Sequence, residues 1–397
     1  MPHLTLSADV FRYWVIDHVA REIRIVRQDG QESRHPLGDP DPLWGSQVAL
    51  SIFDWDRWWI TSITLRDHVV IAEGYNPLQL DPLAGRPVVY LDQNHWSTLA
   101  RAMLDPARVR KRSEIGPALE LARLAQDARV VLPLSSAHLR EAGALFADQR
   151  YELGVVMASL SGGWQMRHPM QVWRHEGLRM FANLFSTVLP AEPPVMTLEP
   201  YALLDTGVDA WMMDPSDPAL FQMTLTAPSV TLEMLIDLAP APSGPADSWV
   251  HHHQAVTNRV SAMGGPVSRR RAVALGEFWL EHLGAIEGNI LELGWDASVL
   301  LAVAPKERRR LLRRSRMLSF VSELFTQRHV SRSTHWRSND LTDLLFLGCA
   351  AGYANYVAAE AATGNQLRQR QESIGQPPTV FTDLTSLVKA LARDGVK

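Results

Sequence analysis

The sequence predicts an α/β fold whose parallel-sheet core is interrupted by a large, mainly helical insertion and preceded by a small β-rich domain. Three observations support this division of the 397 residues. Short β-branched and aromatic runs fill residues 1–85, which we assign to the N-terminal domain. Strands alternate with helical patterns over residues 86–150 and again over residues 336–397, which form the two halves of the core. Helical patterns separated by proline-rich segments occupy the insertion, residues 151–335.

The N-terminal domain is predicted from strand and turn signals. Residues 11–16 and 22–26 are short runs typical of strands, and Asp29-Gly30 is a turn signal directly after the second run. Alternating and aromatic runs continue from residue 48 to residue 71. Three prolines between residues 77 and 87 then interrupt the pattern, so we expect the domain to end near residue 85.

The core halves are predicted from buried strands and periodic helices. Residues 88–91 and 129–134 are apolar runs that suit strands buried on both faces. Ser135 or Ser136 can N-cap a following helix that carries His138 and Glu141. The other core elements are predicted as helices over residues 115–125, 340–353 and 366–372 and as strands over residues 356–359 and 379–381.

The composition is that of a globular protein, with 46% hydrophobic and 21% charged residues. The single cysteine, Cys349, excludes a disulfide framework and a cysteine zinc site within the chain and favours a reducing compartment. The first residues lack a basic segment followed by a long apolar run, and no stretch approaches the ~20 apolar residues of a membrane span. We therefore expect a cytoplasmic protein with no membrane partner.

An acidic residue ends the first core strand. Asp92 follows residues 88–91, and ligands of open α/β sheets bind at the carboxyl ends of the strands, so Asp92 is expected to face a cleft. Asn94 is then placed to cap the next helix. An alternative is that Asp92 is itself no more than an N-cap.

Further acids occupy corresponding places in the other core elements. Glu141 lies on the helix after the second predicted strand, and Asp340 and Asp343 lie three residues apart in the first turns of another helix, on one face. Glu360 ends the strand of residues 356–359, as Asp92 ends its own. Asn355, just before that strand, is an alternative to Glu360 as the fourth ligand.

In this order, the motifs resemble those of the PIN-domain nuclease superfamily. Asp92-Gln93-Asn94 looks like that family's first motif, residues 130–141 look like its second with Glu141 at the acidic position, and Asp343 matches the third. Glu360 stands where the family usually has Asp. The resemblance covers residues 86–150 and 336–397 and implies a three-layer α/β/α core with residues 151–335 as an insertion.

The resemblance also implies the chemistry. Phosphodiester hydrolysis needs charge stabilisation at the attacking and leaving oxygens, which divalent ions supply, and Mg²⁺ and Mn²⁺ prefer oxygen ligands. Asp92 would anchor the metal, Glu141 and Asp343 would complete its direct ligands, and Glu360 and Asp340 would act nearby. Asn94 and Asn355 would support them. The nucleophile would be metal-bound water.

A strongly basic stretch precedes the third motif. Residues 306–337 carry nine Arg and one Lys against two Glu, although the net charge of the chain is −4. One interpretation is a surface that tracks phosphates, and the other is a solvated helix face or an interface with acidic parts of the protein. The residues assigned to nucleic-acid binding are Arg308, Arg309, Arg310, Arg313, Arg314 and Arg337. Trp336 is expected in the core, and His251, His252 and His253 at an exposed helix start.

The predicted function is a metal-dependent endonuclease, with RNA favoured over DNA as substrate by analogy with the family. The N-terminal domain and the insertion would select the substrate or bind a protein regulator, such as the antitoxin of a toxin–antitoxin system. Two alternatives stay open. One is a DNA or flap-type nuclease, and the other is a non-catalytic PIN-like scaffold that binds RNA or protein.

Overall fold

The computed structural model describes residues 10–38, 47–205, 213–214, 217–238, 247–331 and 335–396. These form two compact units. Unit 1 comprises residues 1–166, 196–242 and 384–397, and unit 2 comprises residues 167–195 and 243–383. Both units mix segments that are distant in the sequence, and each is described by itself below.

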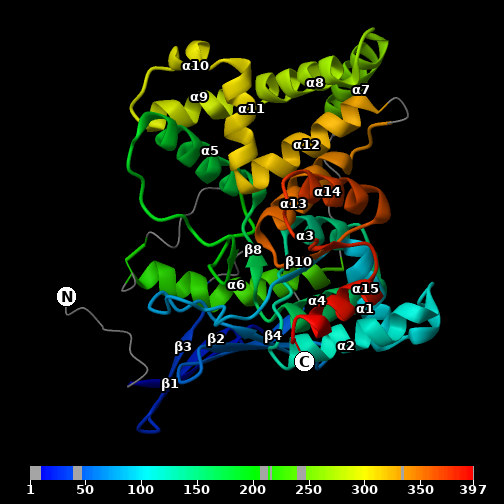
Figure 1. Cartoon of the computed structure of the whole chain (residues 1–397). Coiled ribbons are helices and arrows are strands. Elements are labelled where there is room, and N and C mark those ends of the chain that lie inside the picture. The colour runs from blue at the N-terminus through cyan, green and yellow to red at the C-terminus, as the bar shows by residue number, and fades with distance from the viewer. Residues whose placement is uncertain are drawn as a thin grey trace. The chain divides into compact units, whose positions relative to one another are not determined.

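Unit 1 contains a six-stranded antiparallel sheet with the strand order β3-β2-β1-β4-β5-β6 (Figure 1). Its strands are β1 (Phe11–Asp17), β2 (Glu22–Arg27), β3 (Glu32–Pro36), β4 (Val48–Asp54), β5 (Trp59–Thr64) and β6 (Val69–Glu73). The predicted turn is confirmed, because Gly30 has a φ of 83° and its amide donates to Arg27 O over 3.1 Å. The β-rich character of residues 1–85 is thus confirmed.

Helix α6 (Pro218–Ile236) packs on this sheet. The Ser229 hydroxyl lies 2.7 Å from Ser51 Oγ and 3.0 Å from Ser62 Oγ, and Glu233 accepts from the Val48 amide over 2.6 Å. By length and composition alone, residues 219–236 could cross a membrane, contrary to the expectation that no stretch is so apolar; half of that window is buried in the structure. The hydrogen bonds of Ser229 and Glu233 join this apolar helix to β4 and β5 of the sheet.

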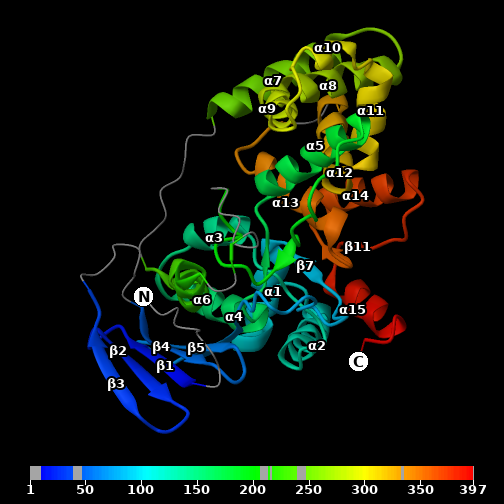
Figure 2. The ribbon, with the colours of Figure 1, turned by 90° about the vertical axis from the view of Figure 1, so that its left-hand side faces the viewer.

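The rest of unit 1 is helical. Strand β7 (Val89–Leu91) leads into the helices, which pack on one another around β7 and on β6 (Figure 2). They are α1 (Gln93–Leu104), α2 (Ile115–Gln126), α3 (Ser136–Gly143), α4 (Ala147–Ser161) and α15 (Leu384–Arg393). The short strands β8 (Gln165–Met166) and β9 (Met196–Thr197) pair antiparallel.

The strand predicted over residues 129–134 is wrong. Residues 130–134 are buried, but they make only isolated parallel bridges, from Val131 to Val88 and from Leu134 to Gln165. Pro133 lies between the two bridging residues and has no N–H to donate, so a continuous ladder cannot run through it.

Unit 2 is mainly helical. Helix α12 (Arg316–Val330) is its central element and packs against α5, α7, α8, α11, α13 and α14. The bounds of its other helices are α5 (Pro169–Phe185), α7 (Asp247–Ala262), α8 (Val267–Glu281), α9 (Leu283–Glu292), α10 (Val299–Ala302), α11 (Pro305–Arg314), α13 (Asp340–Tyr353) and α14 (Ala361–Ser373). Strands β10 (Tyr356–Ala358) and β11 (Val380–Phe381) pair in parallel. The helix predicted over residues 340–353 is confirmed, as are both strands to within two residues.

Candidate functional site

Asp92 directly follows strand β7 and is the N-cap of α1. Its Oδ1 accepts from the backbone amide of His95 over 3.2 Å, and its side chain is 14% exposed. The His95 ring lies beside it, with Nε2 4.0 Å from Oδ1. The N-cap role considered for Asp92 is therefore confirmed, and Asn94, predicted to cap α1, instead lies inside the helix with an exposed side chain.

Helix α3 brings Glu141 to the same end of β7. His138, one turn before Glu141, donates from Nε2 to Leu91 O over 2.8 Å, and Leu91 is the last residue of β7. Residues three apart on a helix share a face, so Glu141 points to the side from which His138 reaches the strand. Asp92 and Glu141 thus lie on helices that both adjoin the carboxyl end of β7.

Unit 2 holds two further predicted acids. Asp343 lies in the first turn of α13, which packs on β10, and Glu360 follows β10 and is the N-cap of α14. Asn355 lies at the other end of β10, away from Glu360, so it is not placed as the alternative ligand that the sequence suggested.

Asp340 is already committed to an ion pair. Its Oδ2 lies 2.5 Å from Arg328 Nη2 and accepts from the Arg337 amide over 2.7 Å. The residue is 6% exposed. Arg328 in turn stacks over the Trp336 ring, 5.1 Å from its centroid, and Trp336 is buried as expected. Asp340 therefore ties the start of α13 to α12 through Arg328.

Among the described residues, no three or more His, Cys, Asp or Glu side chains form a group that could hold a metal ion. A closed zinc site needs about four such ligands, whereas Mg²⁺ usually keeps several waters and takes one or two carboxylates together with substrate phosphates. The role of Asp92, Glu141, Asp343 and Glu360 as metal ligands therefore stays a prediction.

The arginines of α11 do not form one surface. Arg308 donates from Nε to Val303 O over 2.9 Å and its guanidinium lies 5.3 Å from the centroid of the Trp279 ring, so it holds α11 against α8. Arg309 and Arg313 line one cavity, and Arg310 and Arg314 line another. Residues four apart share a face of a helix, whereas adjacent residues point in different directions, so the two pairs lie on different faces of α11. Arg337, the sixth residue of the predicted patch, is exposed.

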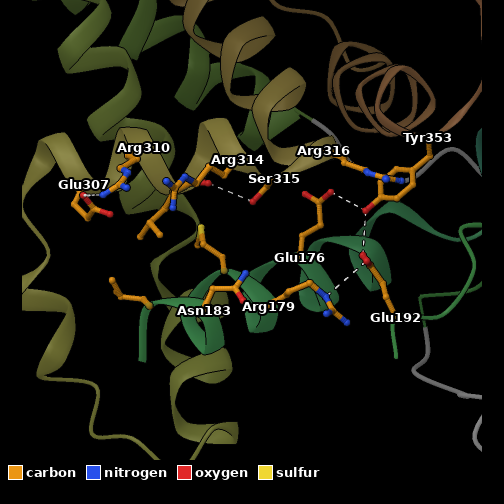
Figure 3. A pocket seen from close by; sticks show the side chains of 13 residues that line it. Glu176, Arg179, Asn183, Glu192, Glu307, Arg310, Arg314, Ser315, Arg316 and Tyr353 are labelled. Atoms are coloured by element: carbon orange, nitrogen blue, oxygen red, sulfur yellow. Dashed lines mark hydrogen bonds and ion pairs between the residues drawn. The ribbon is translucent and has the colours of Figure 1, made fainter. Parts of the chain in front are cut away.

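Figure 3 shows the second of these cavities, of about 400 Å³, with Glu176 at its wall. Glu176, on α5, accepts from the amides of Met317 and Leu318 over 2.7 and 2.9 Å and so caps α12 from another helix. The Tyr353 hydroxyl donates to its Oε1 over 2.8 Å. Burial raises the pKa of Glu176, and these hydrogen bonds partly oppose the rise. A capping residue 140 positions before its helix gives no local signal in the sequence.

A buried histidine pair was also missed. His253, expected at an exposed helix start with its two neighbours, is 1% exposed, whereas His251 and His252 are exposed. Its Nδ1 lies 3.3 Å from His329 Nε2, and its Nε2 lies 3.0 Å from Glu281 Oε1. Burial and the neighbouring His253 lower the pKa of His329 to about 3. The His253 ring also packs on Trp336, and the His329 ring on Phe325, so the pair is part of the core of unit 2.

No family model, curated protein or solved structure matches this chain.

Proposed function

We propose that this chain is a metal-dependent nuclease of the cytoplasm with a PIN-like core, and that it cleaves RNA phosphodiester bonds, by analogy of its motifs. The observation that supports the proposal is that Asp92 and Glu360 each follow a strand, β7 and β10, and each is the N-cap of the next helix. Glu141 lies on α3, which His138 joins to the end of β7, and Asp343 lies in the first turn of α13. Carboxylates at these positions are the expected ligands of Mg²⁺ or Mn²⁺.

The residues of the chain have distinct tasks in this proposal. Bound divalent metal supplies charge stabilisation for the hydrolysis of a phosphodiester by water. Asp92 and Glu141 in unit 1, and Asp343 and Glu360 in unit 2, would supply carboxylate ligands. His138 is a positioning residue, because both of its ring nitrogens are used: Nε2 donates to Leu91 O and Nδ1 accepts from the Ser135 amide over 3.0 Å. It holds α3, and with it Glu141, at the end of β7 and is not available to transfer a proton.

A second candidate function is a non-catalytic scaffold that binds RNA or protein. The observation that favours it is that two of the acids have structural roles. Asp92 caps α1, and Asp340 pairs with Arg328. An acid retained for capping or for an ion pair needs no metal to explain it.

The substitution Asp92→Asn separates the two candidates. Asn is as good an N-cap as Asp, so the variant keeps the start of α1 but loses the charge that a metal needs. We expect cleavage of single-stranded RNA in Mn²⁺ to fall by about 100-fold or more, since even the loss of residues that only support metal ligands costs about 10- to 100-fold. Asp127→Asn, an exposed change beyond the end of α2, is the matched control.

The outcomes are read on RNA and DNA substrates with both proteins. Cleavage that survives Asp92→Asn unchanged would come from a contaminant or from another site and would refute the assignment. Absence of cleavage by the wild-type chain, together with tight RNA binding, would favour the scaffold. Faster cleavage of DNA than of RNA would reassign the substrate.

A further inference from the structure

A second cavity in unit 2, of about 440 Å³, is lined mainly by arginine. It lies among α8, α11, α12 and α14. Five arginines and one acid, Glu323, are among the described residues that line it, and the hydroxyls of four Ser and Thr side chains and a few apolar side chains complete it. The arginines are Arg269, Arg271, Arg309, Arg313 and Arg370. A wall with this excess of positive charge favours an anion.

The single acid is already paired. Glu323 accepts from Arg271 Nη2 through both carboxylate oxygens, over 2.5 and 2.7 Å. Its Oε1 also accepts from the side-chain amide of Gln327, Nε2, over 3.0 Å. The ion pair neutralises one arginine of the five. No other carboxylate is among the described residues that line the cavity, so the remaining four guanidinium groups have no acidic partner in its wall.

Arg370 gives the most direct evidence for an anion site, because two of its buried donor atoms have no protein acceptor among the described residues. It is 4% exposed, and its Nη1 donates to Ser373 Oγ over 3.3 Å. Within the described part of the chain, its Nε and Nη2 have no hydrogen-bond partner. Burial lowers its pKa, and the nearby charges of Arg313 and Arg271 lower it further against the opposing effect of Glu323. A buried guanidinium with unmet donors is costly, and an oxyanion would meet them.

We propose that this cavity binds a phosphate group of single-stranded nucleic acid, with Arg370 at its base and Arg309 and Arg313 at its mouth. Guanidinium forks match phosphate oxygens, and Arg309 and Arg313 are exposed and four residues apart on one face of α11. The volume exceeds that of a phosphate, and Leu275 and Leu312 offer apolar contact to the attached nucleoside.

The choice of a strand over a free mononucleotide rests on the proposed function, whereas the phosphate site itself does not. Arg370 lies ten residues after Glu360 along α14, which corresponds to about 15 Å of helix. A strand held at Arg370 would thus be anchored at a phosphate distant from the acids of the same unit. The cavity would position the strand and take no part in bond cleavage.

The test compares two double variants on one helix. Arg309→Gln/Arg313→Gln removes the mouth of the cavity, and Arg310→Gln/Arg314→Gln makes the same charge change at adjacent positions that line the other cavity. All four side chains are exposed, so both proteins are expected to fold. Binding of a 12-nucleotide oligouridylate is measured against salt concentration in EDTA, where metal-dependent cleavage is absent and a failure of the nuclease proposal has no effect on the readout.

We expect Arg309→Gln/Arg313→Gln to weaken binding at least about 10-fold and to lower the slope of log affinity against log salt by about 0.7, which is the contribution of one phosphate contact with a single strand. The control variant should keep the wild-type slope. If both variants lost the same amount of affinity, or if neither variant lost any, the proposed site would be overturned. Uridine 5′-monophosphate that binds as tightly as the oligonucleotide, and loses affinity in the same variant, would overturn the assignment to a strand.

Discussion

His138 joins helix α3 to strand β7 by donating from Nε2 to the carbonyl oxygen of Leu91 over 2.8 Å. The same ring accepts from the Ser135 amide at Nδ1 over 3.0 Å and so completes the capping box of α3. These two bonds fix the neutral tautomer with hydrogen on Nε2, because a protonated Nδ1 could no longer accept. Burial lowers the pKa of His138 to about 4 despite the hydrogen bond to Leu91, which acts in the opposite direction.

The first prediction is that His138 makes unit 1 less stable in acid. The folded-state pKa of about 4 lies below the unfolded value of 6.5, so the unfolded chain binds more protons between these values and stability falls as the pH falls through that window. From pH 7.5 to pH 5.0 the contribution amounts to about 2 kcal/mol. Urea denaturation of the wild type and of His138→Gln should show the variant with a pH dependence smaller by that amount.

His35→Gln is the control, because His35 is exposed on β3 of the same unit. It should leave the pH dependence of the wild type intact. A pH dependence that His138→Gln does not reduce would mean that the buried imidazole takes up its proton in the folded state, against the geometry of its two hydrogen bonds.

Local order was predictable from the sequence where the signal itself is local. The strands predicted over residues 11–16 and 22–26 follow from β-branched and aromatic runs, the turn after them from a glycine with positive φ, and the bounds of α13 from its apolar pattern. Strand β3, with the sequence ESRHP, has no such run and is not predicted. The segment of residues 129–134 shows the limit. Its apolar composition correctly predicts burial. It does not predict that the hydrogen-bonded ladder is interrupted, which we attribute to Pro133.

The candidate site could be predicted less completely, because its contacts join distant segments. The sequence identifies Asp92 and Glu141 as acids beside strands but not the 2.8 Å contact between His138 and Leu91 that relates them. The run of arginines on α11 is visible, and its division into two faces follows from the helix period. Arg370, 57 residues after Arg313, has no local sign of lining the same cavity.

The second prediction concerns Glu176 as the cap of α12. Glu176→Ala leaves the amides of Met317 and Leu318 buried without an acceptor, so we expect the free energy of unfolding to fall by about 3 kcal/mol. Glu176→Gln keeps one acceptor oxygen and should cost less. Thermal or urea denaturation measures both. An Ala variant as stable as the Gln variant would show that the two amides find another acceptor.

The third prediction separates Arg308 from its neighbours. Arg308→Ala removes the contact with Trp279 and the bond to Val303 O, and we expect a loss of about 1–2 kcal/mol in unfolding free energy. Arg309→Ala, at the next and exposed position, should stay within about 0.5 kcal/mol of the wild type. In the oligonucleotide assay the order reverses. Arg309→Ala lowers the salt slope, by at most about 0.7, and an equal effect of Arg308→Ala would return that residue to the binding surface.

The fourth prediction distinguishes two acids three residues apart on α13. Asp340→Asn breaks the buried ion pair with Arg328 and should lower the unfolding free energy of the chain by about 3 kcal/mol, because it leaves a guanidinium without its carboxylate. Asp343 is less buried, and as a metal ligand it should instead govern Mn²⁺ affinity and cleavage, with a smaller effect on stability. Denaturation and Mn²⁺ titration of the two variants measure both effects side by side.

The reverse pattern would change the assignment. If Asp340→Asn kept its stability but lost Mn²⁺ affinity, the ion pair with Arg328 would have to open to admit metal, and Asp340 would join the ligands as the sequence first suggested. Arg328→Gln decides between the two cases, since it removes the partner while it keeps the acid. With Asp340 as a structural anchor, this variant is destabilised much as Asp340→Asn is and binds Mn²⁺ as the wild type does. With Asp340 as a ligand, removal of the competing cation raises the affinity for Mn²⁺.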